Sequence, residues 1–449
     1  MTATAAVSGF ATPRSRKMGG PYASPVDRIR IRYRLATRLE RLLGYERKLL
    51  GILIGFTVGL VTNIATDSGL NHPGNPFSVL GQVFNYRRVS GCLAGVAVLG
   101  MVTAVAGRPV LERYTRRWNW LGVLSQVFSE ARDPELSWLD DSTLAWGGQI
   151  MLQSAPNLRE GWKASAVELV VEQPEYRLPS RQAAAFQRFV STADPQRVAA
   201  RGPKFGLASN PVSFTDNPTL RLNVRETEYA KILYFKDKIA PNRQRRQALI
   251  RSLLQDRRVG FPNNITLQAV IATQDGKLLL TRRSPKVEYY PGRWSCSIEE
   301  QLAQPDLEPD DGGTVGRWVT RMLTEELGFR NQTLRQWYDQ DARILGVFLE
   351  SAVLNTGVIA LVMLGCDSAA LTKILRTHPR SDYEFGDFAF LGWDDVAREV
   401  VNPSRDYHPT AAIRMLMAGF ARFGPLTFVE RLVDARVAVP VRPAAEPLP

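Results

Sequence analysis

Two adjacent glutamates, Glu325 and Glu326, are the residues of this sequence best placed to do chemistry. They lie in TVGRWVTRMLTEELGF, whose apolar spacing predicts a helix that ends at Gly328. Helical geometry puts positions 322, 325 and 326 on one face, and Met322 occupies the first of them. Hard divalent cations prefer carboxylate oxygens, so the two acids suffice to hold one ion. The alternative is an exposed helix end, but acids there oppose the helix dipole, which favours a functional reason for the pair.

Further carboxylates lie close enough in the sequence to complete such a site. Glu299 and Glu300 belong to a predicted strand that leads into the acidic loop AQPDLEPDDGG, and Glu384 precedes a later strand. Each of these acids has the alternative of a solvated surface charge. The acids of the loop are Asp306, Glu308, Asp310 and Asp311.

The segments around these residues predict a sheet with helices packed on it. From Asn264 the chain has two strands joined by an Asp275-Gly276 turn, which is a strong hairpin signal. The segment VEYYPGRWSCSIEEQL then predicts a turn and a third strand, and ILGVFLES and TGVIALVMLGC are apolar, β-branched strands. YEFGDFAFLGWDDVAREV predicts a strand and a short helix, and HPTAAIRMLMAGFARFG predicts a closing helix.

Over about residues 260–425 the chain resembles the Nudix hydrolases. The resemblance rests on DGKLLLTRRS, YPGRW, RMLTEELGF and FLGWDD, and the family box has the pattern G-x5-E-x7-R-E-U-x-E-E-x-G-U, where U is apolar. Two positions depart from the box: Met322 replaces the glutamate after the arginine, and Gly313 stands where an earlier glutamate is expected. The matching positions are Arg321, Leu323, Glu325, Glu326, Gly328 and Phe329.

This resemblance implies a fold, a reaction and a set of site residues. The fold class is α/β, a Nudix-like α/β/α sandwich, and the reaction is cleavage of a diphosphate linked to another group, with Mg²⁺ (or Mn²⁺) as cofactor. Arg321 also has a structural reading, in which it bonds a carboxylate or carbonyl inside the domain. The catalytic assignment is Glu325, Glu326 and Arg321; the metal assignment is Glu325, Glu326 and Glu300; the substrate-binding assignment is Arg282, Arg283 and Trp294.

The N-terminal part of the chain predicts a membrane anchor. Leu49 to Ala65 and Ser90 to Gly107 are two uncharged, mostly apolar runs, each near the lower length limit of a transmembrane helix. Residues 1–120 hold 17 Lys and Arg against five Asp and Glu, which is +12 of the chain's net charge of +13. These basic residues flank the two runs, which predicts both chain ends on the cytoplasmic side of the cell membrane. The alternative is a pair of buried core helices.

The remaining segments complete the predicted domain organisation. ARGPKFGLASNPVSFTDNP in the middle region is typical of an irregular loop, and a strand and basic-faced helices follow it. The basic segment 27–48 is predicted to be a juxtamembrane helix that lies either on anionic headgroups or in solvent. The predicted units are a disordered N-terminus (1–26), a basic juxtamembrane helix (27–48), a transmembrane hairpin (49–107, with spans 49–65 and 90–107), an α+β middle region of unknown role (108–255), a Nudix-like domain (256–428) and a C-terminal tail (429–449).

Composition excludes several classes of protein. Three cysteines and three histidines without ligand spacing exclude a disulfide scaffold and a zinc protein. Residues 121–449 carry only the remaining +1, so a nucleic-acid partner is not expected. RQRR and QDRR in the middle region are interpreted as a solvated helix face rather than a nucleic-acid patch.

Two functions fit these observations. The first is a membrane-anchored Nudix-type hydrolase that cleaves a nucleoside diphosphate-linked or related pyrophosphate substrate at the cytoplasmic face. The second is a catalytically impaired Nudix-fold module that binds a nucleotide or a protein partner as a sensor. The WSCS segment is also loosely similar to the isopentenyl diphosphate isomerases, but the metal-binding histidines of those enzymes are missing.

Overall fold

The structure is a computed structural model that describes most of the chain from Phe128 to Val437. The expected N-terminal segments, the hairpin over 49–107 and the end of the expected tail lie outside the described residues. Within the described ranges, no helix combines the length and apolar character needed to cross a membrane. The described residues are 124, 128–139, 143–195, 203–214, 219–287, 289–307, 314–338, 342–377 and 385–437.

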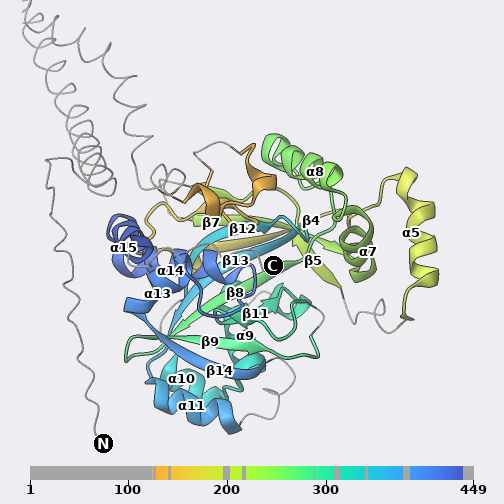
Figure 1. Cartoon of the computed structure of the whole chain (residues 1–449). Coiled ribbons are helices and arrows are strands. Elements are labelled where there is room, and N and C mark those ends of the chain that lie inside the picture. Colours follow the sequence, from red (N-terminus) through yellow and green to blue (C-terminus); the bar gives the residue numbers. More distant parts are fainter. Residues whose placement is uncertain are drawn as a thin grey trace, which may run out of the picture.

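Ten strands of the described chain form one large mixed sheet (Figure 1). Its path runs β1-β2-β12-β13-β8-β9-β10, while β3 pairs with β12, β11 with β8 and β14 with β9. β8 and β13 run parallel and are buried along almost their whole length, as expected of apolar strands at the centre of a sheet. The strands are β1 (Ala145–Trp146), β2 (Gln149–Ser154), β3 (Trp162–Lys163), β8 (Ile265–Ala272), β9 (Lys277–Arg283), β10 (Trp294–Ser295), β11 (Ile298–Gln301), β12 (Arg343–Glu350), β13 (Asn355–Met363) and β14 (Phe385–Gly392).

The predicted hairpin is confirmed by the connection between β8 and β9. Gly276 has a φ of +74°, a backbone conformation that glycine adopts without steric cost. The carboxylate of Asp275 accepts hydrogen bonds from the Thr273 hydroxyl (2.6 Å) and from the backbone N–H of Ser368 (2.9 Å). The turn is therefore fastened to the start of helix α11.

Helices pack on the large sheet from several directions. α14 is buried along nearly its whole length and packs on β8, β12 and β13, whereas α9 packs on β11 and on β4 of a second sheet. On α9 the apolar residues recur at helical spacing, and this buried face holds the helix in place. These helices are α9 (Thr314–Leu327), α10 (Asn331–Trp337), α11 (Ser368–Thr377), α13 (Trp393–Val401), α14 (Ala411–Phe423) and α15 (Pro425–Val437), with short turns η1 (Ser129–Ala131), η2 (Pro134–Leu136), η3 (Ala164–Ala166) and η5 (Gln304–Leu307).

A second, four-stranded sheet is built from the middle region. β7 pairs in parallel with β4 and antiparallel with β5 and β6. Residues 200–218 were expected to be an irregular loop, and this was wrong: β5 and β6 lie there, paired with β7, because long-range strand pairing overrides the local Pro/Gly/Asn signal. The elements are β4 (Val167–Glu172), β5 (Lys204–Leu207), β6 (Val212–Phe214), β7 (Thr219–Thr227), α5 (Ser180–Thr192), α7 (Tyr229–Tyr234), the π-helical turn η4 (Phe235–Ile239) and α8 (Arg243–Asp256).

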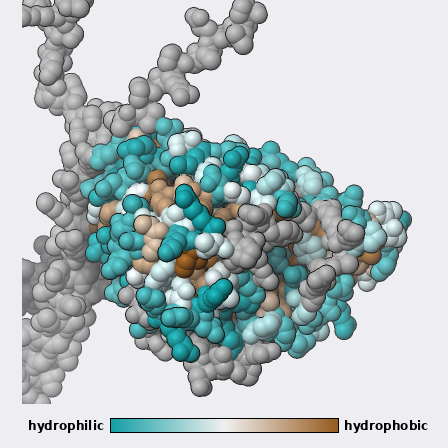
Figure 2. Space-filling model, turned by 90° about the horizontal axis from the view of Figure 1, so that it is seen from below, coloured by the Kyte–Doolittle hydropathy of each residue, from teal (hydrophilic) through white to brown (hydrophobic). Residues whose placement is uncertain are grey.

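The middle region also contributes to the large sheet. β2 pairs antiparallel with β12, and β3 pairs with the start of β12, so strands from residues 145–163 extend the sheet formed by the C-terminal part. The expected mixed α/β class is thus observed in the described residues. Figure 2 shows a mostly hydrophilic face with small hydrophobic patches. Among the described residues, the large hydrophobic side chains that are exposed are Val170, Val171 and Val212.

Candidate functional site

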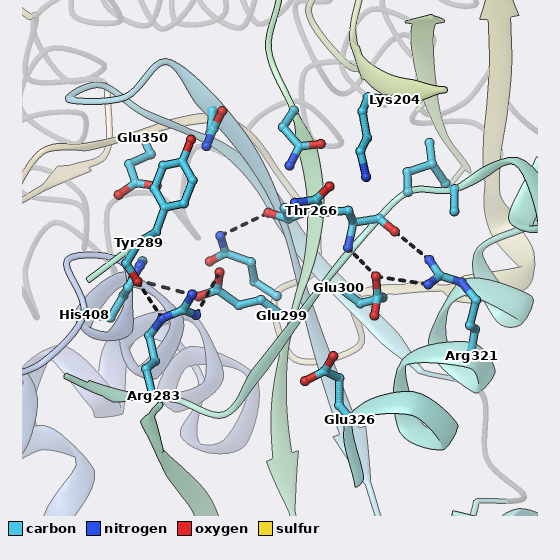
Figure 3. Close-up of a pocket in the computed structure, with 16 residues that line it drawn as sticks. Lys204, Thr266, Arg283, Tyr289, Glu299, Glu300, Arg321, Glu326, Glu350 and His408 are labelled. Atoms are coloured by element: carbon cyan, nitrogen blue, oxygen red, sulfur yellow. Dashed lines mark hydrogen bonds and ion pairs between the residues drawn. The ribbon is translucent and has the colours of Figure 1, made fainter. Parts of the chain in front are cut away.

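A polar cavity of about 410 Å³ opens where the two sheets and α9 meet. The large sheet supplies most of its walls, α9 supplies two side chains, and β5 of the second sheet supplies one (Figure 3). Its lining contains both acids and bases, together with a group of side-chain amides. The lining residues are Lys204, Asn264, Thr266, Gln268, Arg283, Tyr289, Glu299, Glu300, Gln301, Leu302, Ala303, Arg321, Glu326, Glu350, Asn355 and His408.

Arg321 of α9 pairs with the acidic residues Asp306 and Glu300 on one side of the cavity. Its Nε and Nη2 lie 2.9 and 2.7 Å from the two carboxylate oxygens of the buried Asp306, and its Nη1 lies 3.0 Å from Glu300 Oε1. Nη2 also donates to the backbone carbonyl of Gln301 (2.5 Å). Burial lowers the pKa of Arg321, but hydrogen bonds and charges from Asp306 and Glu300 outweigh it, and the net shift is upward. The structural role expected for this arginine is therefore observed.

Glu300 has a raised pKa although it pairs with Arg321. Burial raises its pKa above the ordinary value, and the Arg321 charge only partly opposes the shift. Its Oε1 also accepts the backbone N–H of Gln301 (2.8 Å). Both contacts are made by the same carboxylate oxygen, Oε1.

Glu299, on the other side of the cavity, pairs with a fully buried arginine. Arg414 of α14 donates to Glu299, to the Cys296 carbonyl (3.1 Å) and to the Thr410 hydroxyl. Arg283 Nη1 lies 3.7 Å from the same carboxylate. Burial alone raises the pKa of Glu299, but the charges of Arg414 and Arg283, and that of His408 when it is protonated, lower it to about 2. Glu299 is therefore ionised across the physiological range.

His408 lies against this pair as a neutral imidazole. Its Nδ1 accepts the backbone N–H of Thr410 (3.2 Å), which leaves the ring proton on Nε2. Burial lowers the pKa of His408 to about 3, although Glu299 opposes the shift. The ring also makes an edge contact with Tyr290 at 4.7 Å between centroids. The hydrogen bond from the backbone N–H ties His408 to Thr410, the N-cap of α14.

Glu350, at the end of β12, is a second buried acid in the cavity. Its side chain is 6% exposed, and burial, reinforced by the charge of Glu299, raises its pKa to about 8. Glu350 is therefore mostly protonated at neutral pH, beside an acid that is ionised. The two carboxyls consequently differ in what they offer a ligand: Glu299 accepts hydrogen bonds, and Glu350 can also donate one.

Several buried oxygens of the cavity lack a hydrogen-bond partner among the described residues. They belong to side-chain amides and to one carboxyl group, and three of the side chains are more than nine-tenths buried. A buried polar atom without a partner costs about 1–3 kcal/mol, so a ligand that donates hydrogen bonds here would recover stability. These atoms are Asn264 Oδ1, Gln268 Oε1, Gln301 Oε1, Glu350 Oε1 and Asn355 Oδ1.

The structure brings together four of the residues assigned from the sequence. Glu300, Arg321, Glu326 and Arg283 all line the cavity. Glu326 points toward its centre from α9 (Figure 3). The other three, Arg282, Trp294 and Glu325, do not line it.

Arg282, Trp294 and Glu325 point elsewhere. Successive side chains of a strand face opposite sides, so Arg283 enters the cavity while the exposed Arg282 bonds the Gly292 carbonyl (3.0 Å). The ring of Trp294 lies 5.2 Å from the guanidinium of Arg405. Glu325, with a side chain 43% exposed, lies 3.4 Å from Arg321. Arg282, Trp294 and Glu325 therefore do not line the cavity, although Glu325 contacts Arg321, which does.

Among the described residues, the positions assigned to the metal do not form a preformed magnesium site. We expected positions 322, 325 and 326 to share a face, but Met322 is fully buried in the core and Glu325 lies outside the cavity lining. In the part of the chain that the structure describes, no group of three His, Cys, Asp or Glu side chains is placed to hold a metal ion. Asp306 is engaged by Arg321. The acids Glu308, Asp310, Asp311 and Glu384 lie outside the described residues.

Sequence reasoning missed three parts of the lining. Lys204 lies in a segment interpreted as loop, Glu350 ends a strand interpreted as wholly apolar, and the amides carry no motif. One signal was available for Glu350, because a charged residue that closes an apolar strand marks the edge of a core. Lys204 offered none, since its position depends on contacts between β5 and the distant strands β8 and β13.

No protein-family model and no curated protein matches the chain. Solved structures do match part of it. DR0079 from Deinococcus radiodurans is 14% identical, with 34% of this chain and 80% of that chain covered and a TM-score of 0.25. Tm1382, described as a proposed Nudix hydrolase, is 12% identical (34% and 70% covered, TM-score 0.23). The MutT protein from Methanosarcina mazei Go1 is 17% identical (40% and 97% covered, TM-score 0.21). Each of these structures matches less than half of this chain.

Proposed function

We propose that the cavity binds a nucleotide-type small molecule that carries a diphosphate, within a Nudix-like domain. The observation that carries this proposal is the set of five buried, unpartnered oxygens beside the basic groups of Lys204, Arg283 and Arg321. Sugar hydroxyls and base N–H groups donate hydrogen bonds that such oxygens accept, whereas phosphate oxygens suit the lysine and arginine donors. A single ligand with both kinds of group matches the lining.

The size of the cavity agrees with this class of ligand. A volume of about 410 Å³ lies within the usual range for small-molecule pockets, about 300–1,000 Å³. It is lined by more polar than apolar groups, which favours a hydrophilic ligand over a lipid or an aromatic metabolite. We therefore favour the sensor function, a module that binds such a ligand.

Hydrolysis of the bound molecule is the second candidate, and two acids favour it. Glu326 lines the cavity as a carboxylate, and Glu350 has a pKa of about 8, close to the value that suits a general acid at neutral pH. The buried Met322 leaves the box without its third acid, so the metal-assisted reaction implied by the resemblance lacks a preformed ion site among the described residues.

A ligand panel on the purified full-length chain tests the proposal. The panel is pyrophosphate, ADP, GDP, CDP, UDP, ADP-ribose and UDP-glucose, each with and without Mg²⁺, read by thermal unfolding and by phosphate release. A bound ligand at 100 times its Kd adds about 2.7 kcal/mol to the free energy of unfolding. Stabilisation without product supports the sensor, whereas Mg²⁺-dependent product that Glu326→Gln abolishes supports the hydrolase. If no member of the panel stabilises the chain, the proposal is wrong.

We further propose that residues 49–107 anchor this module in the cell membrane, with both chain ends in the cytoplasm. The support is the pattern of basic residues that flank the two apolar runs. Protease added to sealed inside-out vesicles should then cut the C-terminal part, and right-side-out vesicles should protect it. Cleavage in right-side-out vesicles alone would reverse the orientation, and release of the intact chain by high salt would exclude an integral anchor.

A further inference from the structure

Lys204 differs from the other cations around the cavity, and the difference lies in its partners. Arg321 is paired with Asp306 and Glu300, and Arg283 and Arg414 both face Glu299. For the Lys204 ammonium, no carboxylate lies within ion-pair distance among the described residues. Its Nζ lies 5.9 Å from the centroid of the Tyr229 ring. Among the described residues, Lys204 is thus a basic residue of the lining that forms no ion pair.

The surroundings of Lys204 favour an anion as its partner. Burial lowers the pKa of the amine, which shows that its charged form is partly desolvated, and the Arg321 charge acts in the same direction. Glu300, the acid that opposes this shift, is already bound to Arg321. An anion placed in the cavity beside Lys204 would restore the lost solvation, whereas a divalent cation there would be repelled.

The strand that carries Lys204 is held firmly against the large sheet. Asn263, just before β8, clamps Leu207 at two points: its Oδ1 accepts the Leu207 N–H (2.9 Å) and its Nδ2 donates to the Leu207 carbonyl (2.9 Å). Its Oδ1 also accepts the hydroxyl of Thr356 at 3.1 Å, so the clamp includes β13. Gly206 allows this close approach, because a Cβ there would lie 2.1 Å from the Asn263 carbonyl oxygen.

We infer that Lys204 is an anion-binding residue of the cavity and that it takes a phosphate of the bound diphosphate, so that the ligand is held by both sheets. The inference rests on the proposed function and adds a role for the middle region. β5 pairs with β7, and β7 pairs with β4, so the ligand contact on Lys204 belongs to the four-stranded sheet as a whole. Ligand binding therefore joins the middle region to the C-terminal part.

Calorimetry on the full-length chain tests this role. The titrants are pyrophosphate, the four diphosphates ADP, GDP, CDP and UDP, and their nucleosides. Lys204→Gln should weaken pyrophosphate and the diphosphates by about 10-fold or more, the usual loss for a charge-assisted hydrogen bond, and should leave nucleoside binding unchanged. Lys204→Arg, which keeps the charge, should bind within about three-fold of the wild type. Lys163→Gln, on an exposed position of β3, is the matched control and should bind like the wild type.

The possible outcomes distinguish a wrong role for Lys204 from a wrong proposed function. If the wild type binds a diphosphate and Lys204→Gln binds it equally well, the role of Lys204 is wrong while the proposed function stands. If the wild type binds none of the titrants, both fail together. Should Lys204→Gln misfold, Lys204→Met provides a second neutral side chain of similar length, and its diphosphate affinity decides the question in the same way.

Discussion

Glu299 and Glu300 are adjacent on β11, yet they pair with arginines of different helices. Glu299 pairs with the fully buried Arg414 of α14, and Glu300 lies 3.0 Å from Arg321 of α9. Because successive side chains of a strand point in different directions, one short strand connects two helices that come from separate parts of the sequence. Both ion pairs lower the pKa of their acid, but burial outweighs the pair at Glu300, so the net pKa shift is downward for Glu299 and upward for Glu300.

Removal of Arg414 should cost more stability than any surface substitution. Arg414→Met leaves Glu299 buried without its main partner, and breaking such a pair costs about 3–5 kcal/mol. Urea unfolding measures this loss. Arg398→Met is the matched control, because that side chain is 65% exposed and its pair with Asp395 lies on the surface of α13, so we expect a change below about 0.5 kcal/mol. Equal losses in both variants would mean that Arg414 does not stabilise Glu299.

Glu350 should make the protein less stable as the pH rises. Its folded pKa is about 8 and its ordinary value is 4.5, so between these values the folded chain holds a proton that the unfolded chain has released. The free energy of unfolding then falls with rising pH in this window, by up to about 1.4 kcal/mol per pH unit. Glu350→Gln should remove this fall, which urea titrations from pH 4.5 to 8.5 detect.

Two comparisons distinguish the effect of Glu350 on stability from the effects of other acids. Glu168→Gln, at a half-exposed position on β4, should leave the slope of stability against pH unchanged. Glu299 acts in a different window: its pKa of about 2 lies below the ordinary 4.5, so its contribution is present above pH 4.5 and is lost as the pH falls toward 2. A Glu350→Gln curve that stays parallel to the wild type between pH 4.5 and 8 would show that Glu350 is ionised in the folded state.

Restoring the family's glutamate at position 322 should destabilise the protein without creating a metal site. The side chain is fully buried, so Met322→Glu places a carboxylate in the apolar core, where the expected cost is several kcal/mol, and it should not raise the affinity for Mg²⁺. Met322→Leu conserves volume and polarity and should cost less than about 1.5 kcal/mol. Thermal unfolding and Mg²⁺ titration of both variants check this. A stable Met322→Glu with tighter Mg²⁺ binding would instead place position 322 at the cavity.

Local features of this fold could be predicted from the sequence, because they depend on residues that are close together in the chain. The Asp275-Gly276 turn requires a positive φ at Gly276, and α9 shows its apolar spacing directly. The burial of Met322 was not readable, since helical spacing gives a face but does not say which neighbour covers it. The site residues that were missed, Lys204 and Glu350, are more than a hundred residues apart and line one cavity through sheet packing, which no local pattern encodes.

Gly206 should be the most sensitive position for the placement of Lys204. A Cβ at 206 would lie 2.1 Å from the carbonyl oxygen of Asn263, which is backbone and cannot move away cheaply. Gly206→Ala should therefore force β5 away from β8, lower the free energy of unfolding by about 1–3 kcal/mol, and weaken pyrophosphate binding as Lys204→Gln does. Gly260→Ala is the control, because nothing lies within 4 Å of its Cβ position. If Gly206→Ala destabilises the chain but binds pyrophosphate normally, the Asn263 clamp supports the fold without positioning Lys204.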